Sequence, residues 1–277
     1  MISRRNLLTG LAAVTAPALA GCGRGQPPTG AGFASASSAS PYPNVPGLDA
    51  IIDISHNVTV TDFGAVRRSG ILAVIHKVSE GGDWFDPSYA PRRHQAENAG
   101  LLWGAYHFGT GQYSGADQAR AFLRAAQPSA TTVMSLDVEV NDRRPANSMR
   151  LNQAEAFVQT VHQATGRLPM VYVHPRWANG EKMGRGGRTL GGAITPQSIL
   201  AKCDLWLVDY REQPEVPYAW AGRGWKIWQY LADEDASKAA HGTTPRAISG
   251  VSHCDRNLFN GDTAELYRFW RSRPLGA

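Results

Sequence analysis

The stretch TTVMSLDVE, residues 131–139, joins a run of β-prone residues to two acids that are one residue apart. In a β-strand, residues i and i+2 point to the same face, so we expect Asp137 and Glu139 side by side. Two neighbouring carboxylates separate their pKa values, because ionising one opposes ionising the other. One then serves as an acid and the other as an anion, as glycoside hydrolysis requires. The alternative from this stretch alone is a strand end with two solvated acids paired to arginines.

Further apolar stretches recur along the chain at a similar spacing. They are short, rich in β-branched or aromatic residues and nearly continuously apolar, as strands covered on both faces are. With residues 132–138, the predicted strands are residues 48–54, 71–78, 101–108, 170–174, 205–210 and 225–230.

Helical patterns lie between or after these strands. One runs from Asp86-Pro87 to Gly100, and others cover residues 116–126, 151–165 and 263–271. Strands that alternate with helices favour parallel βα units. Helices become scarce after Leu205, and no Gly-rich phosphate loop follows the first strand. The sequence therefore predicts an α/β fold with a single closed β/α barrel rather than an open doubly wound sheet.

The first residues have the pattern of an export signal. Residues 3–8 (SRRNLL) resemble a twin-arginine signal, and the apolar run that follows to Ala20 is too short for a membrane-spanning helix. The run ends in Leu19-Ala20-Gly21-Cys22, which resembles the lipobox of bacterial lipoproteins. We expect residues 1–21 to be a signal peptide and Cys22 to carry lipid that holds the exported protein at a bacterial membrane, on its periplasmic or cell-surface face. An uncleaved signal anchor with an incidental cysteine is the alternative.

Residues 23–46 consist mainly of Gly, Pro, Ser and Ala, which cannot bury enough surface to order themselves. We expect residues 22–46 to be a lipidated cysteine and a flexible tether, and residues 47–277 to be one folded domain. The net charge of the chain is +5, from 28 Lys and Arg against 23 Asp and Glu. Removing Arg4 and Arg5 with the signal leaves 26 against 23, or about +3. No dense basic run indicates nucleic acid, and we expect a monomer.

In such barrels, functional side chains lie at the C-terminal ends of the strands. Here these ends carry acids, histidines and aromatic residues. Sugars suit such a lining, because aromatic rings stack on the apolar sugar faces and carboxylates serve the hydroxyls and the glycosidic oxygen. The motifs are Asp53-x-Ser55-His56, Lys77-x-Ser79-Glu80-Gly81, Gly104-x-Tyr106-His107-Phe108, Asp137-x-Glu139, Trp228-Gln229-Tyr230 and Asp255-x-Asn257-x-Phe259.

Together, and in this order, the six motifs resemble glycoside hydrolase family 25, the Chalaropsis-type lysozymes or N-acetylmuramidases. The resemblance runs from about Gly47 to Phe259. It implies a modified TIM-like barrel of about five βα units followed by three strands. It also implies cleavage of peptidoglycan at the β-1,4 bond between N-acetylmuramic acid and N-acetylglucosamine.

The resemblance implies catalytic roles for four acids. Glu139 matches the family's proton donor, and Asp137 matches a supporting acid beside it. Asp53 and Asp255 match two further acids at the barrel mouth, one of which acts on water or on the N-acetyl group of the substrate. Retaining, inverting and substrate-assisted mechanisms stay open. Substrate binding is expected from a larger set: Tyr106, His107, Tyr172, Asp209, Tyr210, Trp228 and Gln229.

Two stretches depart from the family pattern. Asn57 follows His56 at once, and Val58 stands where Gln is usual. Residues 177–197 form a long Gly-rich segment with Lys182, Arg185 and Arg188. We interpret this segment as a solvated surface loop. The alternative is a loop over the groove whose charge meets the carboxylates of peptide stems.

Other chemistries have weaker support. His107, His174 and Asp209 suggest a metal site, but the chain has no H-x-H after the first strand and no H-E-x-x-H, so we expect no metal and no cofactor. Cys203 and Cys254 are expected as buried thiols, with a disulfide as the alternative. For the whole protein, the alternatives are a wall-binding lipoprotein that no longer cuts and a metal-dependent barrel hydrolase.

Overall fold

The computed structural model describes residues 39–42, 44–184, 186–232 and 246–271. The expected signal peptide, Cys22 and most of the expected tether lie outside these residues. Within them, no helix has the length and apolar character needed to cross a bilayer.

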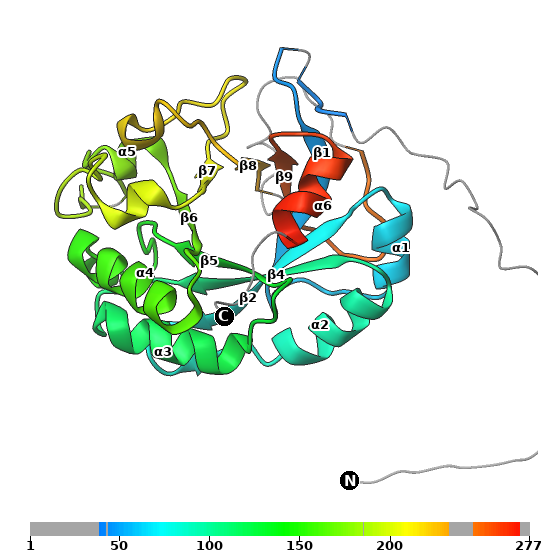
Figure 1. Ribbon diagram of the computed structural model, residues 1–277, viewed down its shortest axis with the longest axis horizontal. Helices are drawn as coiled ribbons and strands as arrows, with labels where there is room; N and C mark the ends of the chain where they lie inside the picture. The colour runs from blue at the N-terminus through cyan, green and yellow to red at the C-terminus, as the bar shows by residue number, and fades with distance from the viewer. Residues whose placement is uncertain (1–38, 43, 185, 233–245, 272–277) are drawn as a thin grey trace, which may run out of the picture. The chain divides into compact units, whose positions relative to one another are not determined.

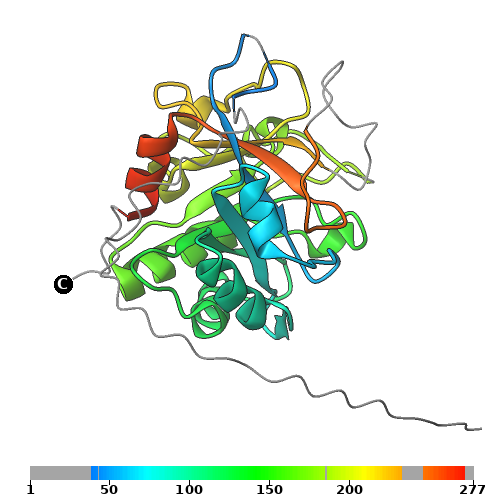
Figure 2. The ribbon, with the colours of Figure 1, turned by 90° about the vertical axis from the view of Figure 1, so that its right-hand side faces the viewer.

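Eight strands close into a barrel (Figure 1). They are β1 (Leu48–Ile54), β2 (Ala73–Glu80), β4 (Leu102–Phe108), β5 (Val133–Asp137), β6 (Met170–Val173), β7 (Leu205–Val208), β8 (Ile227–Leu231) and β9 (Asp255–Phe259). Each strand pairs with the next in this order, and β9 pairs back to β1. The pairs from β1 to β8 are parallel, whereas β9 is antiparallel to both β8 and β1, beside which it lies in Figure 2. The predicted closed barrel is confirmed.

Helices cover the outside of the first part of the barrel. They are α1 (Phe63–Arg68), α2 (Tyr89–Asn98), α3 (Gly115–Ala126), α4 (Leu151–Thr165) and the single turn α5 (Pro175–Ala178), and they follow β1, β2, β4, β5 and β6. The 3₁₀ turns are η1 (Pro145–Asn147), η2 (Ile199–Lys202) and η3 (Tyr218–Trp220). Among the described residues no α-helix separates β7, β8 and β9, so the expected five βα units followed by three strands are confirmed. The sequence did not predict α1, α5 or β3 (Trp84–Phe85), which forms a hairpin with β2.

Local signals set the ends of the long helices. The side chain of Ser114 accepts a hydrogen bond from the backbone N–H of Asp117 and so caps the first turn of α3. The helix α4 ends at Gly166, whose φ of +68° lies in the left-handed region that glycine enters without strain. Between these ends, Phe122 and Phe157 are buried where the two helices pack together.

The barrel interior is filled at its N-terminal end by the last helix, α6 (Thr263–Arg271), drawn red in Figure 1. Leu266 and Trp270 of α6 are fully buried and pack with interior strand residues such as Ile51. The indole N–H of Trp270 donates to the carbonyl of Trp103 at 2.9 Å. Apolar side chains therefore plug this end of the barrel.

Among the described residues no α-helix lies between β8 and β9, and the outer side near β8, β9 and β1 is covered in another way. Tyr42 stacks on Trp228 with 5.0 Å between ring centroids and meets Tyr230 edge-on at 5.6 Å. Tyr42 and Val45 are both buried. We predicted that the tether reaches residue 46. Tyr42 lies within the expected tether and nevertheless packs on β8.

A buried polar cluster ties the same three strands together. Asp49 of β1 accepts hydrogen bonds from Arg256 of β9 and from the hydroxyl of Tyr230 of β8, the latter at 3.0 Å. All three side chains are buried, so each depends on the others to satisfy its polar atoms.

Candidate active site

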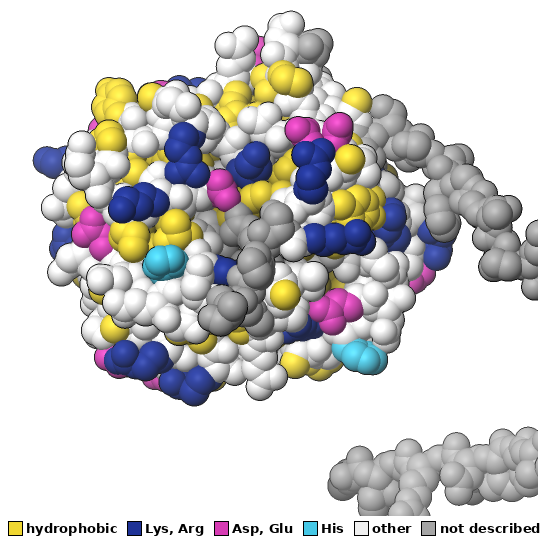
Figure 3. All heavy atoms as spheres, in the orientation of Figure 1, with side chains coloured by type: hydrophobic (Ala, Val, Ile, Leu, Met, Phe, Trp, Pro, Cys, Tyr) yellow, Lys and Arg dark blue, Asp and Glu magenta, His cyan; other side chains and the backbone are white. Residues whose placement is uncertain are grey.

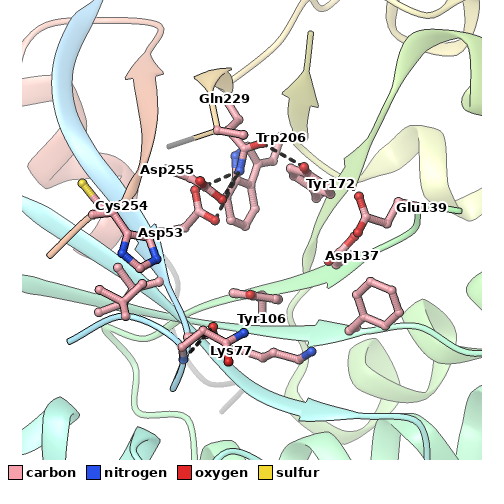
Figure 4. A pocket seen from close by; sticks show the side chains of 17 residues that line it. Asp53, Lys77, Tyr106, Asp137, Glu139, Tyr172, Trp206, Gln229, Cys254 and Asp255 are labelled. Carbon is pink, nitrogen blue, oxygen red and sulfur yellow. Dashed lines mark hydrogen bonds between the residues drawn. The ribbon is translucent and has the colours of Figure 1, made fainter. Parts of the chain in front are cut away.

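A cavity of about 280 Å³ opens at the C-terminal ends of the strands (Figure 4). All eight barrel strands or the residues directly after them contribute to its lining. The four expected catalytic acids all line it: Asp53, Asp137, Glu139 and Asp255. Tyr106, Tyr172 and Gln229 of the expected binding residues line it too.

Asp255 reaches this end of the barrel because β9 runs backwards. It is the first residue of β9, and in an antiparallel strand the first residue lies beside the last residues of its neighbours. The register pairs Asp255 directly with Asp53. The two acids therefore lie together on one side of the cavity, and Asp137 and Glu139 lie together on the other (Figure 4).

Asp53 is fixed by two buried amides. Gln229 donates through Nε2 to both carboxylate oxygens of Asp53 at 3.2 and 3.0 Å, and Asn257 donates through Nδ2 at 2.7 Å. Asn257 in turn accepts from the indole N–H of Trp206 at 2.7 Å. Each amide is oriented by a second partner, so Asp53 has little rotational freedom.

The other end of the Gln229 amide is also occupied. Its Oε1 accepts from the hydroxyls of Tyr172 and Tyr210, each at 2.9 Å. Tyr210 thus lies beside the cavity and acts on Asp53 through Gln229. The Gln229 side chain therefore connects two tyrosines to one of the expected catalytic acids.

Burial controls the ionisation of Asp53. Removal from water raises its pKa to about 6, against the opposing hydrogen bonds from Asn257 and Gln229 and with Asp255. Near neutral pH, Asp53 is therefore an anion that can still take up a proton.

The acids on the opposite side hold protons more tightly. Burial, followed by the nearby charge of Asp142, raises the pKa of Glu139 to about 7. Burial and the neighbouring Glu139 hold the pKa of Asp137 well above its ordinary range. Oδ1 of Asp137 is buried and, among the described residues, has no hydrogen-bond partner, which also disfavours a charge there. This pair can hold a proton at neutral pH, as a general acid must.

Four expected binding residues do not line the cavity: His107, Asp209, Tyr210 and Trp228. His107 is fully buried on the outer face of β4, where it bonds Ser79 and Gln118 and stacks on Phe157. Trp228 is likewise on the outer face of β8 and donates to the carbonyl of Asp209. Neighbouring residues in a strand face opposite sides, so Tyr106 and Gln229 point inward where His107 and Trp228 cannot.

Asp209 also serves structure in this arrangement. Its carboxylate pairs with Arg211 at 2.7 Å and accepts the backbone N–H of Glu215 at 2.9 Å, outside the cavity. The expected role of Asp209 in binding is therefore not supported. His174 caps α5 through the backbone N–H of Arg176. In the described part of the chain, no three His, Cys, Asp or Glu side chains are grouped to hold a metal ion.

The loop after β1 carries the departure from the family pattern, and both Asn57 and Val58 line the cavity. Contacts with α2 and with the turn that precedes α2 hold this loop in place. Asp86 accepts the backbone N–H of His56 at 2.8 Å, and Arg92 donates to the carbonyl of Val58 at 2.6 Å. The replaced polar position is thus a cavity residue on a fixed loop.

The Gly-rich segment 177–197 folds back beside Glu139. Met183 and Arg188 form an antiparallel bridge, and Gly184 approaches Val140 so closely that a Cβ atom there would lie 2.5 Å from its Cγ1. Lys182 is exposed. The segment therefore packs on the residues that follow β5 rather than standing free in solvent.

Cys203 and Cys254 are both buried, and neither is in a disulfide. Cys203 precedes β7 at the N-terminal end of the barrel, whereas Cys254 precedes the antiparallel β9 at the cavity end. The opposite strand directions keep the two thiols at opposite ends, in agreement with two buried thiols.

Sequence reasoning missed several residues that act at the site: Lys77, Trp206 and Asn257. Lys77 was quoted only as part of a motif and not among the expected site residues, yet it lines the cavity. Trp206 lies in a predicted strand, and Asn257 in a quoted motif. Asn257 lies two residues after Asp255 in the same strand and so faces the same side. That spacing was the available signal.

A β/α barrel with facing pairs of proton-sharing acids and aromatic walls at its rim is the arrangement of a glycoside hydrolase. Residues 52–239 match the family described as Glycosyl hydrolases family 25, and the chain belongs to that family. Lysozyme M1 of Streptomyces globisporus is 28% identical over 230 residues, covering 78% of this chain and 69% of that protein.

Solved structures agree with this assignment. The bacterial lysozyme from Streptomyces coelicolor is similar with a TM-score of 0.66 and 25% identity, covering 82% of this chain and 98% of that one. The muramidase from Trichobolus zukalii gives a TM-score of 0.63 and 27% identity, covering 82% and 99%.

Proposed function

We propose that the protein cleaves peptidoglycan at the β-1,4 bond between N-acetylmuramic acid and N-acetylglucosamine, with Glu139 as the proton donor. The observation that carries this proposal is the pKa of Glu139, which burial raises to about 7 at the rim of a cavity with an acid pair opposite. The similar proteins named lysozyme and muramidase support the choice of substrate.

The proposed reaction uses both sides of the cavity. Glu139 gives its proton to the glycosidic oxygen as the bond from that oxygen to the sugar carbon C1 breaks. The hydroxyl of water completes C1, and the proton that water loses leaves through an acid of the opposite side. Asp53, fixed by Gln229 and Asn257, is the carboxylate placed for this step, either on the water or on the N-acetyl group that attacks first. Asp137 keeps a proton near Glu139 and so favours its reprotonation.

The walls supply binding. Tyr106 and Tyr172 pack edge-on against Trp206, with ring centroids 6.2 and 4.9 Å apart. These rings line the cavity and offer faces and edges for sugar rings, while the hydroxyls of Tyr172 and Tyr210 stay bonded to Gln229. The aromatic groups thus orient a sugar between the two acid pairs.

We also propose that the protein is exported and held at a bacterial membrane by lipid on Cys22. The support is the sequence pattern SRRNLL at residues 3–8 followed by Leu19-Ala20-Gly21-Cys22. The substrate itself lies outside the cytoplasm, which fits an export signal.

The test uses residues 22–277 with Cys22→Ser and isolated peptidoglycan. We expect mass spectrometry to find new reducing ends of muramic acid with this chain and none with the added change Glu139→Gln. Circular dichroism of both chains controls for folding. Reducing ends of glucosamine would change the bond assigned, and retention on the wall without any new ends would favour a binding module instead.

A further inference from the structure

A single cationic side chain faces the acids of the cavity. Among the described residues that line it, Lys77 is the only lysine or arginine, and it meets four carboxyl groups there. Its side chain is 14% exposed. A charge so shielded from water acts more strongly on its neighbours than a surface charge does.

An irregularity in β2 explains how Lys77 is held. Its register with β4 shifts between the pairs Lys77–Tyr106 and Ser79–His107. Ser79 bonds His107 on the outer face, so the strand changes phase after Lys77. In a regular strand, residues i and i+3 point to opposite faces, but the bulge lets the Lys77 and Glu80 side chains meet.

Three groups fix the ammonium of Lys77. Nζ donates to Oε2 of Glu80 at 2.7 Å, and it lies 5.0 Å from the ring centroid of Trp84 and 4.9 Å from that of Phe108. Aromatic faces attract a cation, so the two rings hold the charge without neutralising it. Lys77 is shown beside the Asp137 side of the cavity in Figure 4.

The charge of Lys77 opposes the effect of burial on both acids of that side. After burial and Glu139, Lys77 is the next influence on the pKa of Asp137, and it lowers it. For Glu139, Lys77 is the largest lowering influence, after burial and Asp142 raise the pKa. Without this charge, both acids would release their protons only at higher pH.

We propose that Lys77 is a positioning residue whose fixed charge sets the pH range in which Glu139 passes between its protonated and ionised forms. The inference rests on the proposed role of Glu139 as proton donor. A proton donor must release its proton and regain it in each turnover. Its pKa must therefore lie near the working pH, so that both forms are accessible.

Other charged and titratable groups face the same acids and remain in any variant of Lys77. They are Asp53, Glu80, Tyr106, Asp142, Tyr172 and Tyr210. All of these are acids, so none can replace the positive charge; among the described residues that line the cavity, His253 is the one other basic side chain.

The experiment compares Lys77→Met, which keeps the length of the side chain but not its charge, with Lys77→Arg in residues 22–277 carrying Cys22→Ser. One readout is the pH dependence of kcat/KM on peptidoglycan. The other is the titration midpoint of the Glu139 carboxyl carbon, followed by ¹³C NMR and assigned with Glu139→Gln. We expect Lys77→Met to raise both midpoints by about one pH unit. We expect Lys77→Arg to stay near wild type.

A further variant changes the sign of the effect. Glu80→Gln removes the carboxylate that pairs with Lys77. The positive charge then acts more strongly on Glu139, so we expect the Glu139 titration midpoint to move down. An unchanged NMR midpoint in Lys77→Met would overturn the inference, as would a raised KM with unmoved midpoints, which indicates a substrate contact. If Lys77→Met does not fold, an unmoved midpoint in Glu80→Gln overturns it equally. The NMR titration does not need turnover, so an inactive wild type would count against the proposed function alone.

Discussion

At the scale of single residues, the two acid pairs differ in how the protein treats them. Asp53 accepts hydrogen bonds from two buried amides, which favour its charged form. Glu139 and Asp137 have burial acting on them with one cation in opposition. The same residue type thus becomes an oriented anion on one side and a proton store on the other.

The raised pKa of Glu139 lowers the free energy of unfolding of the protein at high pH. Its pKa rises from an ordinary 4.5 to about 7 in the folded state. Between these values the unfolded chain has released the proton that the folded chain still holds. The free energy of unfolding contributed by this group therefore falls as pH rises through that window and is lowest above pH 7.

We predict that Glu139→Gln, which we expect to remove activity, stabilises the protein at high pH. Relative to wild type, its free energy of unfolding should gain about 2 kcal/mol between pH 4 and pH 8, less than full linkage because the side chain is partly exposed. Urea unfolding at both pH values measures this. An equal difference between variant and wild type at the two values would show that Glu139 titrates normally.

At the scale of elements, residues that precede β1 cover an outer face of the barrel on which no described helix packs. The late strands β7 to β9 follow one another without an α-helix, and aromatic side chains on β8 need cover. Tyr42 supplies it by stacking on Trp228.

We predict that Tyr42→Ala lowers the free energy of unfolding by about 3 kcal/mol, as loss of a buried aromatic side chain does. Tyr218→Ala is the matched control, because Tyr218 is 74% exposed and should change it little. Denaturant midpoints of both variants measure these two changes in the free energy of unfolding. Equal small effects would show that the residues before β1 are dispensable, whereas activity per folded molecule should stay unchanged in both.

Much of this architecture follows from the sequence, and the failures have a common cause. Apolar runs such as residues 48–54 predict strands that are covered on both faces. Because both faces are apolar, the pattern does not show which side chains point into the barrel and which point outward. His107 and Trp228 were therefore placed in the cavity. The bulges after Lys77 in β2 and after Gln229 in β8 shift the phase further, and no residue pattern marks them. The acids were found because their family resemblance fixed them by position.

At the scale of the whole molecule, charge is spread rather than concentrated. On the face seen in Figure 3, Lys and Arg side chains are scattered with acids among them. The cavity, by contrast, gathers four carboxyl groups at the end of the barrel opposite α6.

The proposed anchor makes a prediction at this scale. Cys22→Ala in the full chain should move the protein from the membrane fraction to the soluble fraction of the producing cells, and mass spectrometry should find no acylated N-terminal peptide. Hydrolysis of isolated peptidoglycan should not change, because none of the residues that line the cavity is altered. A membrane fraction unaltered by Cys22→Ala would support an uncleaved signal anchor instead.

The antiparallel last strand has a consequence for the life of the chain. Asp53 comes from the first strand and Asp255 from the last, and they meet only when β9 has entered between β8 and β1. Asn257, which orients Asp53, arrives on the same strand. A growing chain whose β9 has not yet paired therefore has half of its acid pair and none of its alignment, so the nascent barrel cannot hydrolyse glycan before that last pairing.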